Sequence, residues 1–246
     1  MLREMEYQAG FYINSVIAIG WFGAALVSMH LFFIHTNSIA GWTKPQVFLL
    51  LGIYRVVEAI ANATFRVNFE GLPHLIQSGD LDLLLVKPIP TQLLLSFRQL
   101  RIFELPNVLV ACCIIGYSLV QLSAVSLIHI VTGTLFVGVG VVIIYALWFA
   151  IAQVSFWSTK MSSLWQVFNM THTPAIMPIQ VYEGVVRLIL TIAIPVAFVT
   201  TVPAQVFLGT VDWGFALMGV CLAVIFLVGS NQLFHFALKR YASASS

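Results

Sequence analysis

Residues 105–159 contain no Asp, Glu, Lys or Arg. A helix of about 20 apolar residues crosses the roughly 30 Å hydrocarbon layer of a bilayer. The run is therefore too long for one crossing, and the polar residues at 121–123 predict a hairpin near its middle. Of the whole chain, 60% is hydrophobic and 8% is charged. Soluble domains have about a quarter of their residues charged, so this composition indicates an integral membrane protein.

Further apolar windows indicate that the chain is all-α and polytopic. Isolated strands leave unpaired backbone groups in lipid, and the windows lack the alternation of barrel strands. We expect one transmembrane domain over 1–246 with six helices. Their approximate spans are 13–35, 46–66, 105–121, 127–155, 188–207 and 213–236.

The fifth span has two interpretations. Segment 161–182 is uncharged but carries Asn169, His172, Pro174 and Pro178. It either lies along the membrane interface, with 188–207 as span five, or is itself span five. In the second case the segment with Pro195 is a broken, re-entrant element. Hydropathy favours the first interpretation.

The basic residues predict the orientation. With six spans and both termini in the cytoplasm, nine of the 11 Lys and Arg residues lie on the cytoplasmic side. Only Lys44 lies outside, and Arg55 lies within span two. Cytoplasmic loops carry an excess of Lys and Arg, so the reverse orientation is disfavoured. We expect a multi-pass membrane protein with both termini in the cytoplasm.

The remaining composition points away from catalysis and nucleic acid. Cys112, Cys113 and Cys221 lie in apolar windows without metal-ligand spacing, which indicates small packing residues. No Ser-His-Asp or Cys-His arrangement is evident, so we expect neither a catalytic nor a metal site. A net charge of +2 is too small to indicate a nucleic-acid partner.

The loop between spans two and three contains helix boundaries. Pro73 suits a first helical position and Gly79 suits the left-handed residue after a C-terminus. They predict a short helix of about two turns. A second short helix is expected from Pro90, along the membrane surface. These rigid pieces predict a docking site for a soluble partner.

Asp80-x-Asp82 in this loop also allows a catalytic interpretation. Paired carboxylates of this kind can hold a divalent metal with a nucleotide-sugar, as in a membrane glycosyltransferase. Such an enzyme needs a folded nucleotide-binding domain, for which no loop is long enough. A solvated charge pair, or a charged edge of the docking site, explains the residues better.

Span two is unusually polar. Arg55, Glu58, Asn62 and Arg66 are spaced three, four and four apart, which places them on one helical face. Charges at membrane depth face a bundle interior, a water-filled cavity or a partner. The face therefore either lines a translocation path or packs against a neighbouring helix or a second subunit. An ion-coupled carrier or channel would use Arg55 and Glu58 as its working pair.

Three blocks resemble one known family, the permeases of ABC-2-type exporters. GLPHLIQSGDLDLLLVKPIP is similar to the family's aliphatic-x-x-Gly-acid-Leu-Asp-x-Leu-Leu-x-Lys/Arg-Pro pattern. The segment IPVAFVTTVPAQVFLG resembles its Pro-aromatic-Pro segment, and LKRYASASS resembles its tail. The resemblance covers nearly the whole chain, and only the polar span two departs from the pattern.

The resemblance implies the membrane subunit of an ATP-driven exporter, paired with a second copy or a sister permease and with ABC ATPase subunits. The chain shows no G-x-x-x-x-G-K-[ST] phosphate loop, so it is not itself expected to be an enzyme. ATP and Mg would bind the partner ATPase, and this chain would bind no cofactor. In such exporters the loop between spans two and three carries the ATPase-coupling helix. The residues expected to couple are Pro73, His74, Gln77, Gly79, Asp80, Asp82, Lys87 and Pro88.

Overall fold

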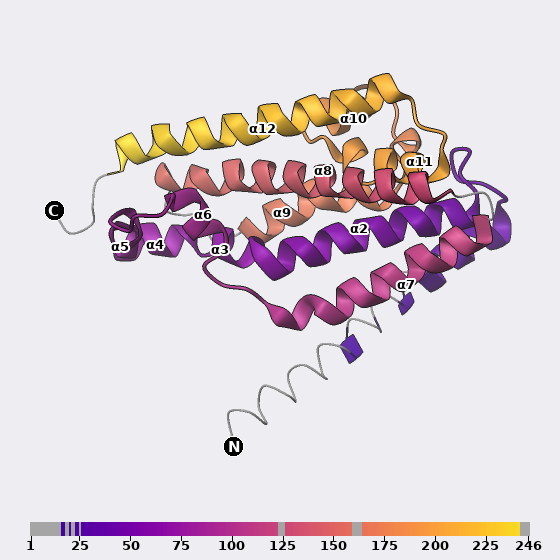
Figure 1. Cartoon of the computed structure of the whole chain (residues 1–246), viewed down its shortest axis with the longest axis horizontal. Coiled ribbons are helices and arrows are strands. Elements are labelled where there is room, and N and C mark those ends of the chain that lie inside the picture. The colour runs from indigo at the N-terminus through magenta and orange to yellow at the C-terminus, as the bar shows by residue number, and fades with distance from the viewer. Residues whose placement is uncertain are drawn as a thin grey trace, which may run out of the picture.

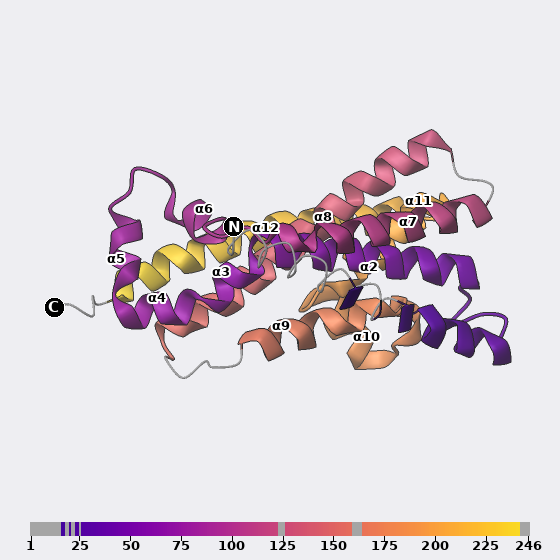
Figure 2. The same cartoon turned by 90° about the horizontal axis from the view of Figure 1, so that it is seen from below.

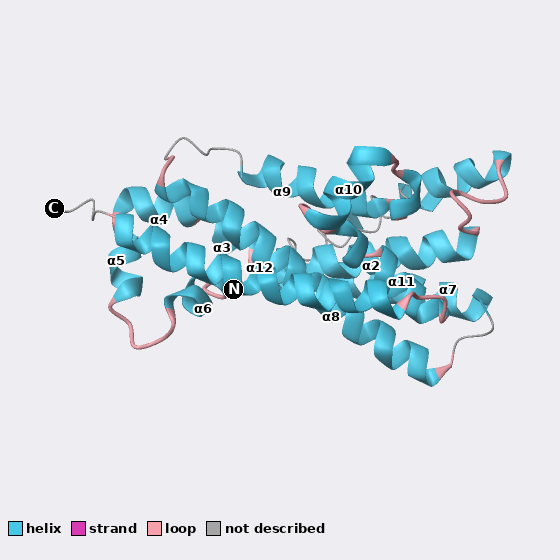
Figure 3. Cartoon of the chain, turned by 90° about the horizontal axis from the view of Figure 1, so that it is seen from above, coloured by secondary structure: helices cyan, strands magenta, loops and turns pink. Residues whose placement is uncertain are grey.

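The structure is a computed structural model, and it describes residues 16–17, 20, 23–24, 26–122, 126–158 and 164–241. Within these ranges the ordered elements are helices, as Figure 3 shows, and the only strand-like pairing is an isolated bridge between Ile39 and Trp42. The long helices are α2 (Lys44–Thr64), α7 (Leu105–Leu122), α8 (Leu127–Ala152) and α12 (Trp213–Arg240).

The long helices lie side by side along the long axis of the molecule (Figure 1). Four short helices follow α2 at one end: α3 (Arg66–Glu70), α4 (Leu72–Ser78), α5 (Asp80–Leu85) and α6 (Thr91–Ser96). We name this end of the bundle the α5 end; the C-terminus of α12 lies there too. The opposite end, where α2 begins, is named the Trp42 end. All four long helices are apolar enough to cross a membrane.

Local sequence explains where these helices begin. The backbone N–H of Thr43 donates to the side chain of Gln46 (2.8 Å), which closes a capping box with Pro45 in the first turn of α2. At α12 the carboxylate of Asp212 accepts hydrogen bonds from the first-turn amides. The loops between the helices are short, so neighbouring helices remain adjacent.

Glycines let α8 and α12 approach the segment before the last helix. A methyl group added at Gly140 would meet the carbonyl oxygen of Val199 at 2.9 Å, and one at Gly133 would meet the ring of Phe207. One at Gly219 would meet Phe198. Small residues at helix interfaces let backbones approach closely, and Gly133 and Gly140 do so in α8.

The segment 164–182 runs the length of the bundle beside α2. It comprises α9 (Leu164–His172) and the 3-10 helices η3 (Thr173–Ile176) and η4 (Ile179–Val181). Asn169 contacts Arg66 near the α5 end, at 2.9 Å, whereas Gln180 accepts a hydrogen bond from Trp42 at the other end, at 3.2 Å. The segment therefore contacts both ends of α2.

The apolar segment that hydropathy preferred is bent and does not parallel α2. Helix α10 (Gly184–Ile192) and the pair η5 (Val196–Phe198) and α11 (Thr201–Leu208) meet at 63°. The bend at η5 lies beside Gly140, midway along α8, while Gly209 after α11 lies against His129 near the start of α8. Figure 2 labels α10 and α11 on opposite sides of α2 in that view, and a pair bent in this way is either a broken span or a re-entrant loop. Pro195 lies at the bend, where a proline interrupts helical hydrogen bonding.

The other expected boundaries agree to varying extents. Spans 46–66, 105–121, 127–155 and 213–236 correspond to α2, α7, α8 with η2 (Gln153–Phe156), and α12. Of the expected span 13–35, residues 13–15, 18–19, 21–22 and 25 lie outside the described residues, and the described ones give helix Leu26–His35. Residues 123–125 of the predicted hairpin are also outside them. Helix α6, the short helix expected from Pro90, ends at Ser96. Bends follow it before η1 (Ile102–Glu104).

Candidate coupling element and polar face of α2

Helices α4 and α5 form a rigid corner at the α5 end. Pro73 lies in the first turn of α4, and Gly79 ends it with φ of 78°, in the left-handed region. The predicted two-turn helix and its glycine terminus are confirmed. Asp80 and Asp82 occupy the first turn of α5, where carboxylates interact favourably with the helix dipole.

One face of the corner is buried and the other is exposed. Leu72, Leu75, Ile76, Leu81 and Leu84 are buried against the rest of the chain. Of the residues expected to couple, His74, Gln77, Asp80, Lys87 and Pro88 are exposed, and Pro73, Gly79 and Asp82 are half-buried. Two apolar side chains join the exposed face, Leu83 at 69% and Val86 at 86% exposure.

The corner contacts the ends of two long helices. Helix α4 packs on η2, which continues α8. Tyr241, at the end of α12, stacks edge-on against Phe156 of η2. Partial burial, and then the negative charge of Asp82, raise the pKa of the Tyr241 hydroxyl. The corner is therefore positioned by α8 and α12 as well as by α2.

Asn68 joins α3 to the loop that leads into α7. Its amide nitrogen lies 2.9 Å from the carbonyl oxygens of both Ser96 and Gln99. Its amide oxygen accepts a hydrogen bond from the backbone N–H of Gln99 at 3.0 Å. The backbone N–H of Arg101 also donates to the carbonyl of Ala63 at 2.8 Å. This junction ties the start of α7 to the end of α2.

The sequence analysis did not single out Asn68. Its only sequence signal is a polar residue two positions after Arg66, and its partners are backbone groups about 30 positions away, which no side-chain pattern marks.

Arg66 is buried in a polar cluster between α2 and α9. Its guanidinium donates to Glu70 at 2.9 Å, to Asn62 at 3.1 Å and to Asn169 at 2.9 Å. The ring centroids of Trp148 in α8 and Trp165 in α9 lie 5.4 and 5.9 Å from the guanidinium carbon of Arg66. Asn62 and Arg66 thus meet as predicted, and Arg66 fastens the end of α2 to α9.

Arg55 and Glu58 form the predicted ion pair, with an N–O distance of 2.8 Å. Their side chains keep 28% and 20% exposure, so the pair is only partly covered by this chain. It lies one to two turns of α2 before the Arg66 cluster. Of the expected polar face, Arg55, Glu58 and Asn62 are therefore half-buried and Arg66 is buried.

Aromatic and polar residues of 164–182 continue this face. His172 stacks on Tyr54 of α2 with ring centroids 4.4 Å apart. A hollow of about 580 Å³ lies along the same segment. It is lined by Asn169, Met170, Thr173, Pro174, Ile176, Met177 and Tyr182.

Metal-binding geometry was sought around Asp80 and Asp82. Within the described ranges, no group of three or more His, Cys, Asp or Glu side chains could hold a metal ion. Asp80 instead accepts a hydrogen bond from Ser78 at 2.8 Å. The observed contacts of the two carboxylates are with protein groups, which gives the glycosyltransferase interpretation no support.

Comparison with known proteins gives one match. No curated protein and no solved structure matches the chain. The model of the family described as ABC-2 family transporter protein matches residues 19–245. That match covers the four long helices, the corner at α4–α5 and the polar face of α2, and it agrees with the resemblance of the three sequence blocks. The chain belongs to the ABC-2 family of transporter proteins, and it is a membrane component of an ABC transporter.

Proposed function

We propose that the chain is the permease subunit of an ATP-driven exporter of the bacterial cytoplasmic membrane, and that a separate ATPase docks on the α4–α5 corner. The observation that carries this proposal is the two-sided corner, with leucines buried on one side and His74, Leu83 and Val86 exposed on the other. Exposed apolar side chains grouped on a protruding element mark interaction surfaces.

The contacts around the corner offer a mechanical route into the membrane. A push on α4 and α5 would reach α8 and α12 through Phe156 and Tyr241. It would reach α2 and α7 through Asn68. Closure of two ATPase subunits would then tilt these helices and change access to a substrate path.

We further propose that the polar face of α2 meets a second permease, either an identical copy or a sister chain. A partly exposed ion pair in a membrane span would face lipid, which is costly, unless another chain covers it. The adjacent hollow along 164–182 would then lie between the two permeases and form part of the translocation path. In this arrangement 164–182 is the fifth crossing and α10–α11 is re-entrant from the outer side.

Binding of a candidate ABC ATPase from the same organism tests the docking proposal. Replacing Leu83 and Val86 by Asp changes only exposed side chains, so the fold is expected to persist while the ATPase no longer co-purifies. Leu100→Asp is the matched control, since that side chain is also 63% exposed but lies outside the corner. Equal ATPase recovery with all three proteins would refute the docking site.

An ion-coupled carrier is the competing function. It predicts transport in liposomes driven by an ion gradient alone, without any ATPase, and dependent on Arg55 and Glu58. ATP-dependent transport that requires the partner ATPase would exclude it.

A further inference from the structure

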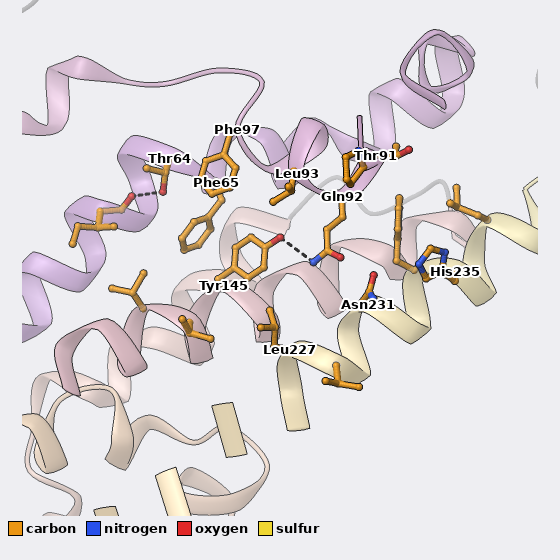
Figure 4. A pocket seen from close by; sticks show the side chains of 17 residues that line it. Thr64, Phe65, Thr91, Gln92, Leu93, Phe97, Tyr145, Leu227, Asn231 and His235 are labelled. Atoms are coloured by element: carbon orange, nitrogen blue, oxygen red, sulfur yellow. Dashed lines mark hydrogen bonds between the residues drawn. The ribbon is translucent and has the colours of Figure 1, made fainter. Parts of the chain in front are cut away.

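A large cavity lies away from the polar face of α2. It has a volume of about 850 Å³ and is walled by the end of α2, by α6, by α8 and by α12 (Figure 4). Ligand pockets in proteins typically measure about 300–1,000 Å³ and are lined mainly by apolar side chains. Neither the corner nor the proposed translocation path uses this cavity.

The cavity extends over the half of the bundle nearer the α5 end. On α12 its lining runs from Leu227 to Leu238, within a helix that spans Trp213–Arg240. Eleven residues of α-helix measure about 16 Å. One leaflet contributes about half of the roughly 30 Å hydrocarbon thickness. The length of the cavity therefore matches one acyl chain of one leaflet.

The lining changes from apolar to polar toward the α5 end. Ile60, Val141 and Leu227 line the deeper part. Asn231 and His235, one helical turn apart on α12, line the part nearer the α5 end. Figure 4 shows these two side chains on the wall that faces α6.

A fixed polar group completes the wall on the α6 side. The amide of Gln92 donates to the Tyr145 hydroxyl at 3.0 Å, and that hydroxyl lies 2.8 Å from the hydroxyl of Ser96. These bonds hold α6 to α8 on this side of the cavity.

A basic residue adjoins the cavity. No Asp or Glu lines it. Lys239, which is exposed, directly follows the lining residue Leu238 in the sequence. Basic residues at a membrane surface attract anionic lipid headgroups, by about 1 kcal/mol each.

We propose that this cavity binds one acyl chain of an anionic phospholipid from the leaflet at the α5 end. The chain lies between α8 and α12, the ester region lies beside Asn231 and Gln92, and the headgroup lies near Lys239. The lipid fills the gap between α6 and the long helices. The site is independent of the transported substrate and of the ATPase.

The test uses the full-length chain in nanodiscs of phosphatidylglycerol and phosphatidylcholine, extracted into mild detergent and examined by native mass spectrometry. Wild type is expected to retain phosphatidylglycerol in preference to phosphatidylcholine. Val228→Trp, which fills the cavity from an exposed position, is expected to reduce the retained phosphatidylglycerol about tenfold. Val224→Trp is the matched control, because this valine is similarly exposed one turn earlier on α12 but does not line the cavity.

The headgroup and the location are tested separately. Lys239→Gln is expected to reduce the preference for phosphatidylglycerol. A phosphatidylglycerol with a photoactivatable acyl chain is expected to label wild-type peptides from α6 and α12 more than those from lipid-exposed α7. This labelling experiment uses the wild-type chain, so it does not depend on the folding of any variant. Equal retention by the two tryptophan variants, retention without headgroup preference, or labelling mainly on α7 would overturn the proposal.

Discussion

Replacing Asn68 by Leu tests whether α2 and α7 are joined at the α5 end. Leucine has nearly the same size but offers no hydrogen bonds, so it leaves the carbonyls of Ser96 and Gln99 and the amide of Gln99 without Asn68. Asn68 is only 8% exposed, so water cannot readily replace it. At a net value of about 1 kcal/mol for each hydrogen bond, the loss of three amounts to about 3 kcal/mol.

Hydrogen exchange measures this loss where it occurs. In the full-length chain in nanodiscs, a change of about 3 kcal/mol in local opening would speed exchange of the Gln99 and Arg101 amides about a hundredfold. Asn107→Leu is the matched control, because Asn107 makes a local hydrogen bond to Glu104 within one turn. Unchanged exchange over 96–101 in Asn68→Leu, or the same increase in Asn107→Leu, would refute the junction.

Three further substitutions test separate parts of the structure. Gly140→Ala should lower the free energy of unfolding by about 1–3 kcal/mol, because its methyl group meets backbone at 2.9 Å. Gly138→Ala should not lower it, because a methyl group there has open space among the described atoms. Chemical denaturation compares the two variants. Arg66→Met should cost about 3 kcal/mol by leaving Glu70 unpaired, and adding Glu70→Gln should restore part of the stability, measured by thermal unfolding. Gly79→Ala should destabilise the corner by about 1 kcal/mol and Gly79→Asn by less, since Asn tolerates positive φ; protease cleavage rates between α4 and α5 report the difference.

Local signals in the sequence predicted local structure well. The run 105–159 gave two helices, and Pro73 with Gly79 gave the bounds of α4, because proline and glycine act through the backbone of the residues next to them. The spacing of Arg55 and Glu58 gave their ion pair for the same reason. Each of these features depends on residues within about one turn.

Features that depend on tertiary packing were not predicted. The contacts of Asn169 and Gln180 with opposite ends of α2 are among them, because hydropathy does not register contacts between distant side chains. The roles of Asn68 and of the cavity beside Tyr145 depend on partners far away in the sequence. A single sequence does not specify such pairings.

Photo-crosslinking from Val86 tests the central proposal most directly. A photoreactive amino acid at this position, which is 86% exposed at the tip of the corner, should form a covalent adduct with the partner ATPase in native membranes. The same amino acid at Thr210, exposed after α11 at the Trp42 end, should not. We predict an ATPase adduct from Val86 alone. An adduct from Thr210, or none from Val86 when the ATPase is present, would contradict docking at the α4–α5 corner.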